Sequence, residues 1–379
     1  MLPTRIVLSR SGTLGWIGLG AMGNPMATNL FTKATAAAKG SSEMPSIVVC
    51  DPSEASVAQF VENVRKVSGD AAADRIKRVD NPRDVSAEAA RVFTMLPSTP
   101  QVEAVYLGEN GLLAGLQGAD QTSLSKAATE LPWLVDGKIM SGVTDASTLF
   151  VDQTTLDPTG AKRVADTVHD KTGRKALMID GPVSGGITGA KAGTLTIMFG
   201  SGDPVASELA TPLMQHMARE GGVVPCGNSG DGVGVKVVNN LILAINQIAL
   251  GEGLALAKAL GIDPVLMHNI INTSSGQSWS SKVNSPLPEV EGGPGARGYT
   301  GGFQTKLMLK DVGLALAAAA AKAQPTPLTW ASKSVYEATC EEGDGSMASK
   351  DFSVVYEWLN QKREQGVEAG FKNGGPGDK

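Results

Sequence analysis

The chain of 379 residues is poor in aromatic residues and cysteine. Aromatic residues make up 4% of the sequence, which leaves little for the stacking platforms of single-strand nucleic-acid binders. The net charge of −5, with no long basic run, also argues against nucleic acid or an anionic membrane as the main partner. Cys50, Cys226 and Cys340 are widely spaced and leave one over from any pair, so we interpret them as buried thiols in a reducing compartment. No uninterrupted apolar run reaches the length of a membrane span.

Motifs of several enzyme classes are also missing. The chain has no H-E-x-x-H motif and no Cys/His cluster at metal-ligand spacing, so we predict no metal site. The absence of G-x-S-x-G argues against an α/β-hydrolase. Only three histidines are present, and His169, His216 and His268 all lie in helical patterns away from glycine turns. We therefore interpret them as surface or packing residues.

Acidic residues are absent from the first 42 positions, which do contain Arg5, Arg10, Lys33 and Lys39. Met1 to Ser11 has the arginine, serine and apolar content of a mitochondrial transit peptide, although it is very short. A disordered basic end explains the same composition. The expectation is mitochondrial localisation, with the cytoplasm as the alternative.

What the sequence does contain is an alternation of strand and helix patterns over its first 229 residues. Short apolar runs at 14–17, 47–50, 91–96, 148–152, 176–180 and 194–200 are separated by helical patterns that include 53–64, 158–172 and 204–217. Such alternation predicts an α/β Rossmann-type fold with a doubly wound, mainly parallel sheet. The polar stretches 33–46 and 118–146 lack a clear period and are interpreted as loops, the second with a little local structure near 131–135.

The pattern changes at residue 230. Residues 232–261 are apolar on nearly all sides and predict one long buried helix, and helical patterns at 264–271, 303–323 and 332–340 follow without a strand. We therefore predict a Rossmann domain over 13–229, an all-α C-terminal domain over 230–362 joined to it by a long interdomain helix, and a flexible tail over 363–379.

A G-x-G-x-x-G motif follows the first apolar run and opens the first helical pattern. Its residues are Gly18, Leu19, Gly20, Ala21, Met22 and Gly23. In a dinucleotide-binding turn the first glycine permits the tight turn, the second lets a pyrophosphate approach the backbone, and the third lets helix and strand pack closely. An ordinary glycine turn is the alternative, because the chain holds 46 glycines.

Two further positions have a chemical reading. Asp51 ends the second apolar run, where an acidic residue bonds the adenosine ribose, and no arginine follows directly, which favours NAD over NADP. Its alternative role is to cap the next helix. Lys236 stands in an apolar helical face four residues before Asn240, so the two share one side of the helix. Desolvation lowers the pKa of a lysine toward the range useful for acid–base work, although a lysine that snorkels from a helix end explains the pattern too.

Four blocks of sequence resemble the β-hydroxyacid dehydrogenase family, which is related to 6-phosphogluconate dehydrogenase. They are GWIGLGAMGNPMATNL (15–30), DGPVSGGITGAKAGTLTIMFG (180–200), GVKVVNNLILAIN (234–246) and GGFQTKLMLKDVGL (301–314). The resemblance implies a lysine acid/base at Lys236 and substrate contacts at Ser184, Gly185, Gly186 and Asn240. It also implies NAD contacts beyond the glycine turn and Asp51, at Leu96, Pro97, Thr155, Phe303 and Lys310.

Within that family, NTSSGQSWSS (272–281) resembles the enzymes that oxidise 3-hydroxyisobutyrate, in which a tryptophan, here Trp279, lines the substrate pocket. The implied activity is NAD-dependent oxidation of 3-hydroxyisobutyrate to methylmalonate semialdehyde in valine catabolism, by a homodimer or homotetramer without nucleic-acid or membrane partners. The alternatives are a reductase of tartronate, glyoxylate or succinic semialdehyde, with NADPH as the possible cofactor, and a non-catalytic cofactor-binding module. The sequence departs from the family at Gln101 and Gln153, near the implied cofactor contacts.

Overall fold

The computed structural model describes residues 9–41, 43–135 and 139–366. The chain divides into two compact units, Met1–Lys236 and Val237–Lys379. The division falls inside the long helix α11 (Asp231–Ala259), so this helix contributes residues to both units.

The first unit is built on a sheet of nine described strands in the order β3-β2-β1-β4-β5-β6-β8-β7, with β9 paired to β8. Adjacent strands from β3 to β6 are parallel, whereas β8 runs antiparallel to both β6 and β7. The strands are β1 (Thr13–Ile17), β2 (Ser46–Cys50), β3 (Ile76–Arg78), β4 (Arg91–Thr94), β5 (Thr148–Asp152), β6 (Ala176–Asp180), β7 (Val183–Ser184), β8 (Leu195–Gly200) and β9 (Ala218–Gly227). The predicted doubly wound, mainly parallel sheet is therefore confirmed.

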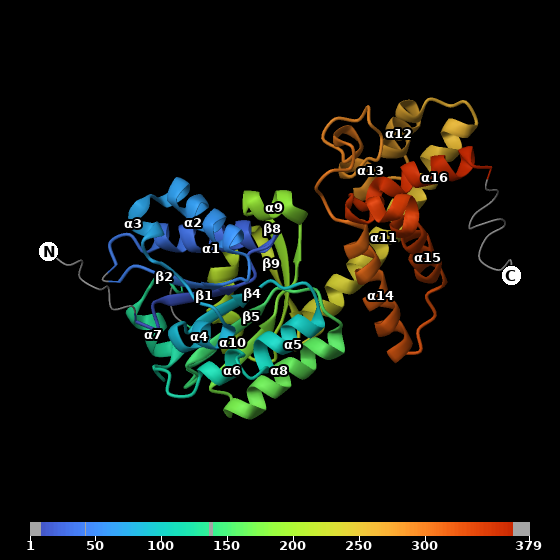
Figure 1. The fold of residues 1–379 in the computed structure, drawn as a ribbon. Coiled ribbons are helices and arrows are strands. Elements are labelled where there is room, and N and C mark those ends of the chain that lie inside the picture. The colour runs from blue at the N-terminus through green and yellow to red at the C-terminus, as the bar shows by residue number, and fades with distance from the viewer. Residues whose placement is uncertain (1–8, 42, 136–138, 367–379) are drawn as a thin grey trace. The chain divides into compact units, whose positions relative to one another are not determined.

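Helices cover both faces of this sheet (Figure 1). On one face Trp16 stacks on Phe93 with ring centroids 5.9 Å apart, in a core cluster that includes Met26 of α1 and Leu213 of α10. On the other face Tyr106 of α5 meets Phe150 edge to face at 5.5 Å. The helices of this unit are α1 (Gly23–Ala37), α2 (Glu54–Ser68), α3 (Asp70–Ala73), α4 (Pro82–Glu88), α5 (Thr99–Leu107), α6 (Leu112–Gly115), α7 (Leu124–Glu130), α8 (Pro158–Thr172), α9 (Gly186–Ala192) and α10 (Pro204–Gln215).

Several short strands and helices, among them β3, β9 and α7, were not predicted from the sequence. β3 is a three-residue strand at the sheet edge with exposed Lys77 and Arg78, so it has no apolar alternation. β9 begins with the polar, glycine-rich sequence AREGG (218–222), and its pairing with β8 contains a register shift. The stretch 118–146 contains α7, and Leu131 and Leu134 after it are buried in the core. The prediction of a loop with a little local structure therefore missed a helix and its contribution to the core.

The first described residues belong to the folded unit. Arg10 is 6% exposed and donates hydrogen bonds to Ser86 O, Asp120 O, Ser147 O and Thr148 Oγ1. These contacts make Arg10 part of the folded first unit and contradict the interpretation of a disordered end at this residue. Met1–Leu8 lie outside the described residues.

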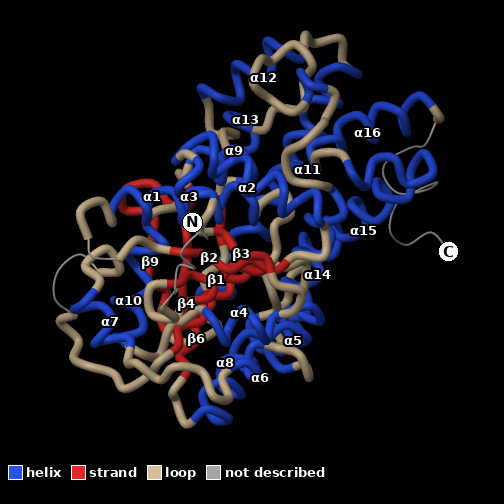
Figure 2. The backbone as a smooth tube through the Cα atoms, turned by 60° about the vertical axis from the view of Figure 1, so that its left-hand side comes forward, coloured by secondary structure: helices blue, strands red, loops and turns tan. Residues whose placement is uncertain are grey.

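The second unit is helical, and its described residues contain no strand (Figure 2). Tyr336 donates to Ala244 O at 3.0 Å, which fixes α15 on α11, and Met308, Val312, Phe352 and Trp358 complete the core. The remaining helices are α12 (Pro264–Thr273), α13 (Trp279–Val283), η1 (Gly295–Arg297), α14 (Thr305–Ala321), α15 (Pro327–Glu341), η2 (Glu342–Ser349), η3 (Phe352–Val354) and α16 (Val355–Glu364). The predicted tail from residue 363 overlaps the end of α16, and residues 367–379 lie outside the described part.

α11 is not buried on all sides, contrary to the prediction. Val238, Ile242 and Leu256 are each more than half exposed. By length and composition alone, α11 also qualifies as a membrane-span candidate, the one such helix among the described residues, with a mean hydropathy of 1.5. Two buried polar residues of α11 hydrogen-bond within the second unit: Asn240 to Asp311 of α14, and Gln247 to Asn284, which directly follows α13. Such bonds are usual for an interior helix of a globular domain.

The cysteines also differ in part from the prediction. All three are free thiols, but only Cys50 is buried, and Cys226 and Cys340 are partly exposed. Cys50 is the last residue of β2 and directly precedes Asp51. Burial raises the pKa of its thiol to about 11.

Candidate active site

The glycine turn between β1 and α1 has the geometry that dinucleotide binding requires. Gly18 has φ +93°, and a Cβ there would overlap Met95 O of the neighbouring strand connection. A Cβ on Gly23 would overlap Gly18 O, so helix and strand approach too closely for a side chain. A Cβ on Gly20, in contrast, would meet nothing within 4 Å. The position expected to face the pyrophosphate is thus the open one.

Asp51 connects the glycine turn to the second strand. Its Oδ2 accepts the Leu19 N–H at 2.6 Å and its Oδ1 accepts the Ser53 N–H at 2.8 Å. The cap of α2 is Ser53, which accepts from Ser56 N, so the alternative role of Asp51 as the helix cap is wrong. Arg78, at the end of the adjacent β3, is paired with Glu54 at 2.9 Å.

A hydrogen-bond network joins the two turns that follow β4 and β5. Leu96 N donates to Thr154 Oγ1 at 3.0 Å, and Thr154 Oγ1 donates to Asp152 Oδ1 at 2.6 Å. Thr94 Oγ1 donates to the same carboxylate oxygen at 2.8 Å. Burial raises the pKa of Asp152 to about 6, against the effect of these hydrogen bonds. The turns that carry Leu96, Pro97 and Thr155 are therefore held together by Asp152 and Thr154.

Gln153, one of the departures from the family, is fully buried beside this network. Its backbone N–H donates to Thr94 O at 2.8 Å, while neither side-chain amide atom has a hydrogen-bond partner among the described residues. A buried amide without partners normally has a ligand or water to bond.

The segment after β6 forms a glycine-rich loop. Ser184 ends β7 and pairs with Thr196 of β8, and Gly185 and Gly186 follow with φ +134° and +61°. Glycine is the residue that adopts such angles without strain. Successive residues of this kind can aim backbone N–H groups at an anion, as the carboxylate-binding prediction requires.

Lys236 lies in the second turn of α11 and is 8% exposed. Asn240 follows one turn later on the same side of the helix and is 1% exposed. The structure therefore brings the proposed acid/base and the proposed positioning amide onto one helix face.

Asp311 of α14 holds Asn240 in place. Asn240 Nδ2 donates to Asp311 Oδ2 at 2.6 Å, and Lys310 Nζ pairs with Asp311 Oδ1 at 3.1 Å. The carboxylate is 2% exposed. Asp311 was missed in the sequence, yet it shares the buried face of α14 with Met308 and Val312, and an aspartate at such spacing was the available signal.

Phe303 and Trp279 lie elsewhere in the second unit. Phe303 N donates to Asp351 Oδ2 at 2.9 Å, and its ring packs edge to face on Phe352 at 5.9 Å. Trp279 begins α13 and is 52% exposed. Their predicted roles at the cofactor and the substrate stay predictions.

Two of the three histidines have structural hydrogen-bond partners, and the third, His216, is partly buried, in keeping with their interpretation. His169 Nε2 accepts the Met178 N–H at 3.0 Å, and His268 bonds Ser281 O at 2.9 Å. Burial lowers the pKa of His216 to about 4. Among the described residues no group of three His, Cys, Asp or Glu side chains is placed to hold a metal ion.

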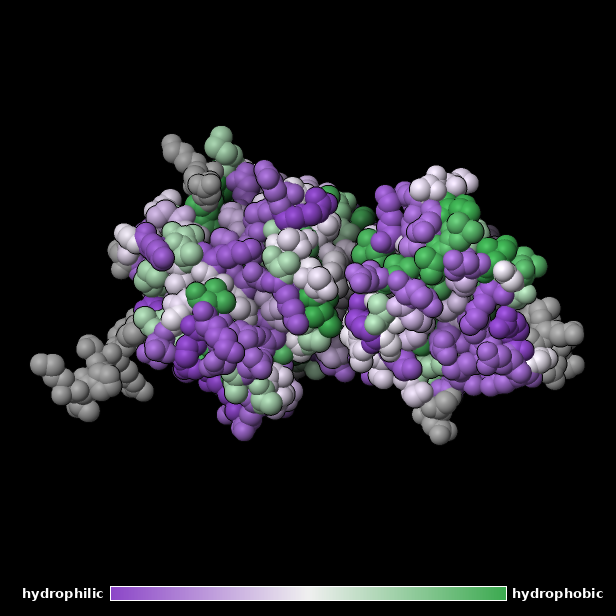
Figure 3. All heavy atoms as spheres, turned by 90° about the horizontal axis from the view of Figure 1, so that it is seen from above, coloured by the Kyte–Doolittle hydropathy of each residue, from purple (hydrophilic) through white to green (hydrophobic). Residues whose placement is uncertain are grey.

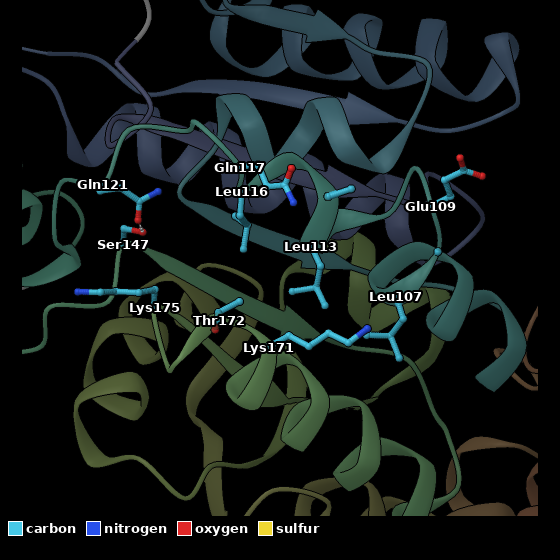
Figure 4. Close-up of a pocket in the computed structure, with 12 residues that line it drawn as sticks. Leu107, Glu109, Leu113, Leu116, Gln117, Gln121, Ser147, Lys171, Thr172 and Lys175 are labelled. Carbon is cyan, nitrogen blue, oxygen red and sulfur yellow. Dashed lines mark hydrogen bonds between the residues drawn. The ribbon is translucent and has the colours of Figure 1, made fainter.

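A cavity of about 570 Å³ lies away from these residues (Figure 4). It is lined by Leu113, Gln117, Lys171 and Lys175, among others, near the start of β5 and β6. Ligands of open α/β sheets bind at the opposite, carboxyl edge, so we do not assign the active site to this cavity.

The residues at the carboxyl edge fit a dinucleotide. The open position over Gly20, the Asp51 carboxylate at the end of β2 and the unpartnered amide of Gln153 lie at the ends of β1, β2 and β5. Gly18 to Gly23 and Asp51 would hold the pyrophosphate and the adenosine ribose.

Two matched glycine substitutions separate folding from binding at this turn. Gly18→Ala should lower the thermal midpoint clearly, because it places a side chain on Met95 O at positive φ. Gly20→Ala should change stability by less than about 0.5 kcal/mol. It should nevertheless weaken NAD binding about tenfold or more, equivalent to about 1.4 kcal/mol. Fluorescence titration with NADH and thermal unfolding measure the two effects, and a Gly20→Ala protein that binds like the wild type would contradict this placement of the pyrophosphate.

Comparisons with known proteins agree with the two-unit architecture. Residues 13–227 match the family model described as the NAD binding domain of 6-phosphogluconate dehydrogenase. Residues 230–359 match the model described as NAD-binding of NADP-dependent 3-hydroxyisobutyrate dehydrogenase.

Individual relatives cover nearly the whole chain. A probable mitochondrial 3-hydroxyisobutyrate dehydrogenase of Dictyostelium discoideum is 35% identical over 93% of this chain and 92% of its own length. An NAD-dependent L-serine dehydrogenase of Pseudomonas aeruginosa is 34% identical over 93% and 99%. The solved structure of Mycobacterium tuberculosis 3-hydroxyisobutyrate dehydrogenase with L-serine matches at a TM-score of 0.68 and 29% identity, covering 92% of this chain and 98% of that one.

Proposed function

Because the chain belongs to the 3-hydroxyisobutyrate dehydrogenase family of NAD-binding oxidoreductases, we propose that it oxidises 3-hydroxyisobutyrate to methylmalonate semialdehyde with NAD, as in valine catabolism. The observation that carries the proposal is the buried Lys236, one helical turn before an Asn240 whose amide is fixed by Asp311. An acid/base and a hydroxyl-positioning group on one helix face are what oxidation of an alcohol requires.

Each residue of the site has a separate role in the proposed reaction. The backbone N–H groups of Ser184–Gly186 and the Ser184 hydroxyl bind the substrate carboxylate. Asn240 orients the C3 hydroxyl, and Lys236 Nζ takes the hydroxyl proton as C3 becomes a carbonyl carbon. Bound NAD supplies the acceptor for the hydride that leaves C3. Leu96, Pro97, Thr155, Phe303 and Lys310 are proposed cofactor contacts, and Trp279 a substrate contact.

L-Serine is the second candidate substrate, because a relative of similar identity is named an NAD-dependent L-serine dehydrogenase. It carries an ammonium group where 3-hydroxyisobutyrate carries a methyl. A substrate panel decides between the two, because Asp311 Oδ1, which lies 3.1 Å from Lys310 Nζ, makes no hydrogen bond among the described residues and gives no reason to exclude an ammonium group.

NAD is proposed over NADP because Asp51 would repel a 2′-phosphate, and because Arg78 nearby is engaged by Glu54. The glyoxylate, tartronate and succinic semialdehyde reductases remain alternatives of the same class.

A panel of short 3-hydroxy acids, including 3-hydroxyisobutyrate, L-serine and glycerate, tests the proposal with NAD and NADP as cofactors. We expect the highest kcat/KM with 3-hydroxyisobutyrate and NAD. The absorbance of the reduced nicotinamide measures the rate. A preference for L-serine would overturn the substrate. Activity confined to NADPH with glyoxylate or succinic semialdehyde would overturn both substrate and cofactor.

Two remaining proposals concern assembly and location. Apolar side chains are exposed on the helical unit, including Leu256, Leu260, Leu266, Leu328 and Trp330, and supply surface for a homodimer or homotetramer (Figure 3). Sedimentation equilibrium measures that state. Mitochondrial residence is proposed from the relative named mitochondrial, and fractionation of the source cells tests it.

A further inference from the structure

The carboxylate of Asp180 joins the strand that leads into the substrate loop to the helix that carries Lys236. Asp180 is the last residue of β6 and directly precedes the loop 181–186. Its Oδ1 accepts the Gly230 N–H at 2.7 Å, and its Oδ2 accepts the Val233 N–H at 2.9 Å. Both of its oxygens thus hold the first turn of α11, and Lys236 lies only three residues beyond Val233.

The surrounding backbone closes tightly on this carboxylate. A Cβ on Gly200 of β8 would lie 2.7 Å from Oδ1, and a Cβ on Gly232 of α11 would lie 2.9 Å from Oδ2. Asp180 itself is 4% exposed. The glycines at 200 and 232 let β8 and α11 approach the carboxylate from two sides, so no space is left for the side chain to move.

Asp152 offers a neighbouring carboxylate with a different set of contacts. The two residues are register partners on the adjacent strands β5 and β6. Asp152 holds the turns of Leu96 and Thr154, whereas Asp180 holds α11. The carboxyl edge of the sheet therefore has two buried carboxylates with different roles. Asp152 orders the turns of the proposed cofactor site, and Asp180 orders the start of the helix that carries Lys236.

We propose that Asp180 is a positioning residue for the hydride-transfer reaction, which sets the place of Lys236 relative to the carboxylate-binding loop 184–186. The inference rests on the proposed function, because it presumes that Lys236 is the acid/base. Asp180 acts through the backbone of Gly230 and Val233 and need not touch the substrate. Its negative charge suits two backbone donors at the start of a helix, where the peptide dipoles favour an anion.

Asp180→Asn is the direct test, since the amide has nearly the same shape but only one acceptor oxygen. One of the two N–H groups must then lose its partner and face an NH₂ group instead. We expect kcat per folded molecule to fall roughly 10- to 100-fold, the effect of a small misplacement of a catalytic group. NAD affinity should stay within about twofold, because the side chain of Asp180 bonds Gly230 and Val233 and not the glycine turn or Asp51. A twofold change in affinity corresponds to about 0.4 kcal/mol. Hydrogen exchange should accelerate at the Gly230 and Val233 amides.

Asp152→Asn is the matched control, with the same chemical change on the adjacent strand. It should weaken NAD binding and leave exchange at Gly230 and Val233 as in the wild type. Val233→Pro is a second route, because it removes one donor to Asp180 without changing Asp180, and proline is tolerated in the first turn of a helix. It should lower kcat in the same direction as Asp180→Asn with NAD affinity retained.

The outcomes distinguish this proposal from the proposed function. If Lys236→Ala is inactive but Asp180→Asn retains wild-type kcat per folded molecule, Asp180 is not a positioning residue and the function stands. A parallel loss of NAD affinity and kcat in Asp180→Asn would also overturn the proposal, since the defect would then be general to the sheet edge. If Lys236→Ala turns over normally, the proposed function fails, and with it the role assigned to Asp180.

Discussion

Lys236→Ala should lower kcat by about 10²- to 10⁴-fold, the usual contribution of a general acid or base. The expectation follows from the position of Lys236, buried in α11 and one turn before Asn240. Without the amine, no side chain that the structure places on this helix face can take the proton from the C3 hydroxyl. NAD affinity should be nearly unchanged, because Gly18–Gly23 and Asp51 keep their geometry. Steady-state kinetics and NADH titration measure the two quantities.

Lys258→Ala is the matched control for this substitution. Lys258 is on the same helix but exposed, in its last turn. Its removal deletes the same side chain from the same helix and should leave kcat unchanged. Ordinary turnover in Lys236→Ala, or an equal loss in the two variants, would show that Lys236 is not the acid/base.

Arg10→Met should cost about 3–5 kcal/mol of unfolding free energy in the first unit, because its acceptors lose a charged donor, at about 1–3 kcal/mol for each one left buried and unsatisfied. The guanidinium makes four hydrogen bonds, at 3.1 Å to Ser86 O, 3.0 Å to Asp120 O, 2.9 Å to Ser147 O and 2.7 Å to Thr148 Oγ1. Burial lowers its pKa to about 10, so it stays protonated at neutral pH. Loss of the side chain leaves the carbonyls of Ser86, Asp120 and Ser147 and the hydroxyl of Thr148 without this donor, each at a cost. Urea unfolding followed by tryptophan fluorescence measures the effect.

Arg91→Met is the comparison that isolates the hydrogen bonds from the charge. Arg91 is fully buried, but it donates only to Ser11 O at 3.0 Å and Leu124 O at 3.5 Å, and its Nε has no partner among the described residues. Burial and the nearby Arg10 lower its pKa to about 9. Replacing a poorly paired buried charge with a well-packed apolar side chain is often neutral, so we expect less than about 1.5 kcal/mol of loss. Similar losses in the two variants would contradict the weight given to the bonds of Arg10.

The long strands and helices were predictable because their cause is local. Runs such as 148–152 and 176–180 are buried on both sheet faces and read as continuous apolar segments, and the structure places β5 and β6 at those residues. β3 and β9 were not predictable in this way. β3 is an edge strand with charged side chains, and β9 begins in a polar, glycine-rich segment. Both strands depend on the neighbouring strand for their conformation.

The residues of the candidate site can also be separated into those that local sequence predicts and those that it does not. The glycine turn, Asp51 and the Lys236–Asn240 spacing were visible in the sequence, because turn geometry and helix periodicity are short-range properties. Arg10 shows the limit of composition, since a basic residue at the chain start was interpreted as part of a leader or a disordered end and proves to be a buried structural group.

The sequence by itself thus determined the fold class, the dinucleotide turn and the residues with the right chemistry at each strand end. Only the tertiary structure decided what holds those residues in place. Asp311 on Asn240, Thr154 on Leu96 and Asp180 on the start of α11 are contacts between segments 50 or more residues apart. Their partners are chosen by which strands and helices pack side by side, and no local pattern records that choice.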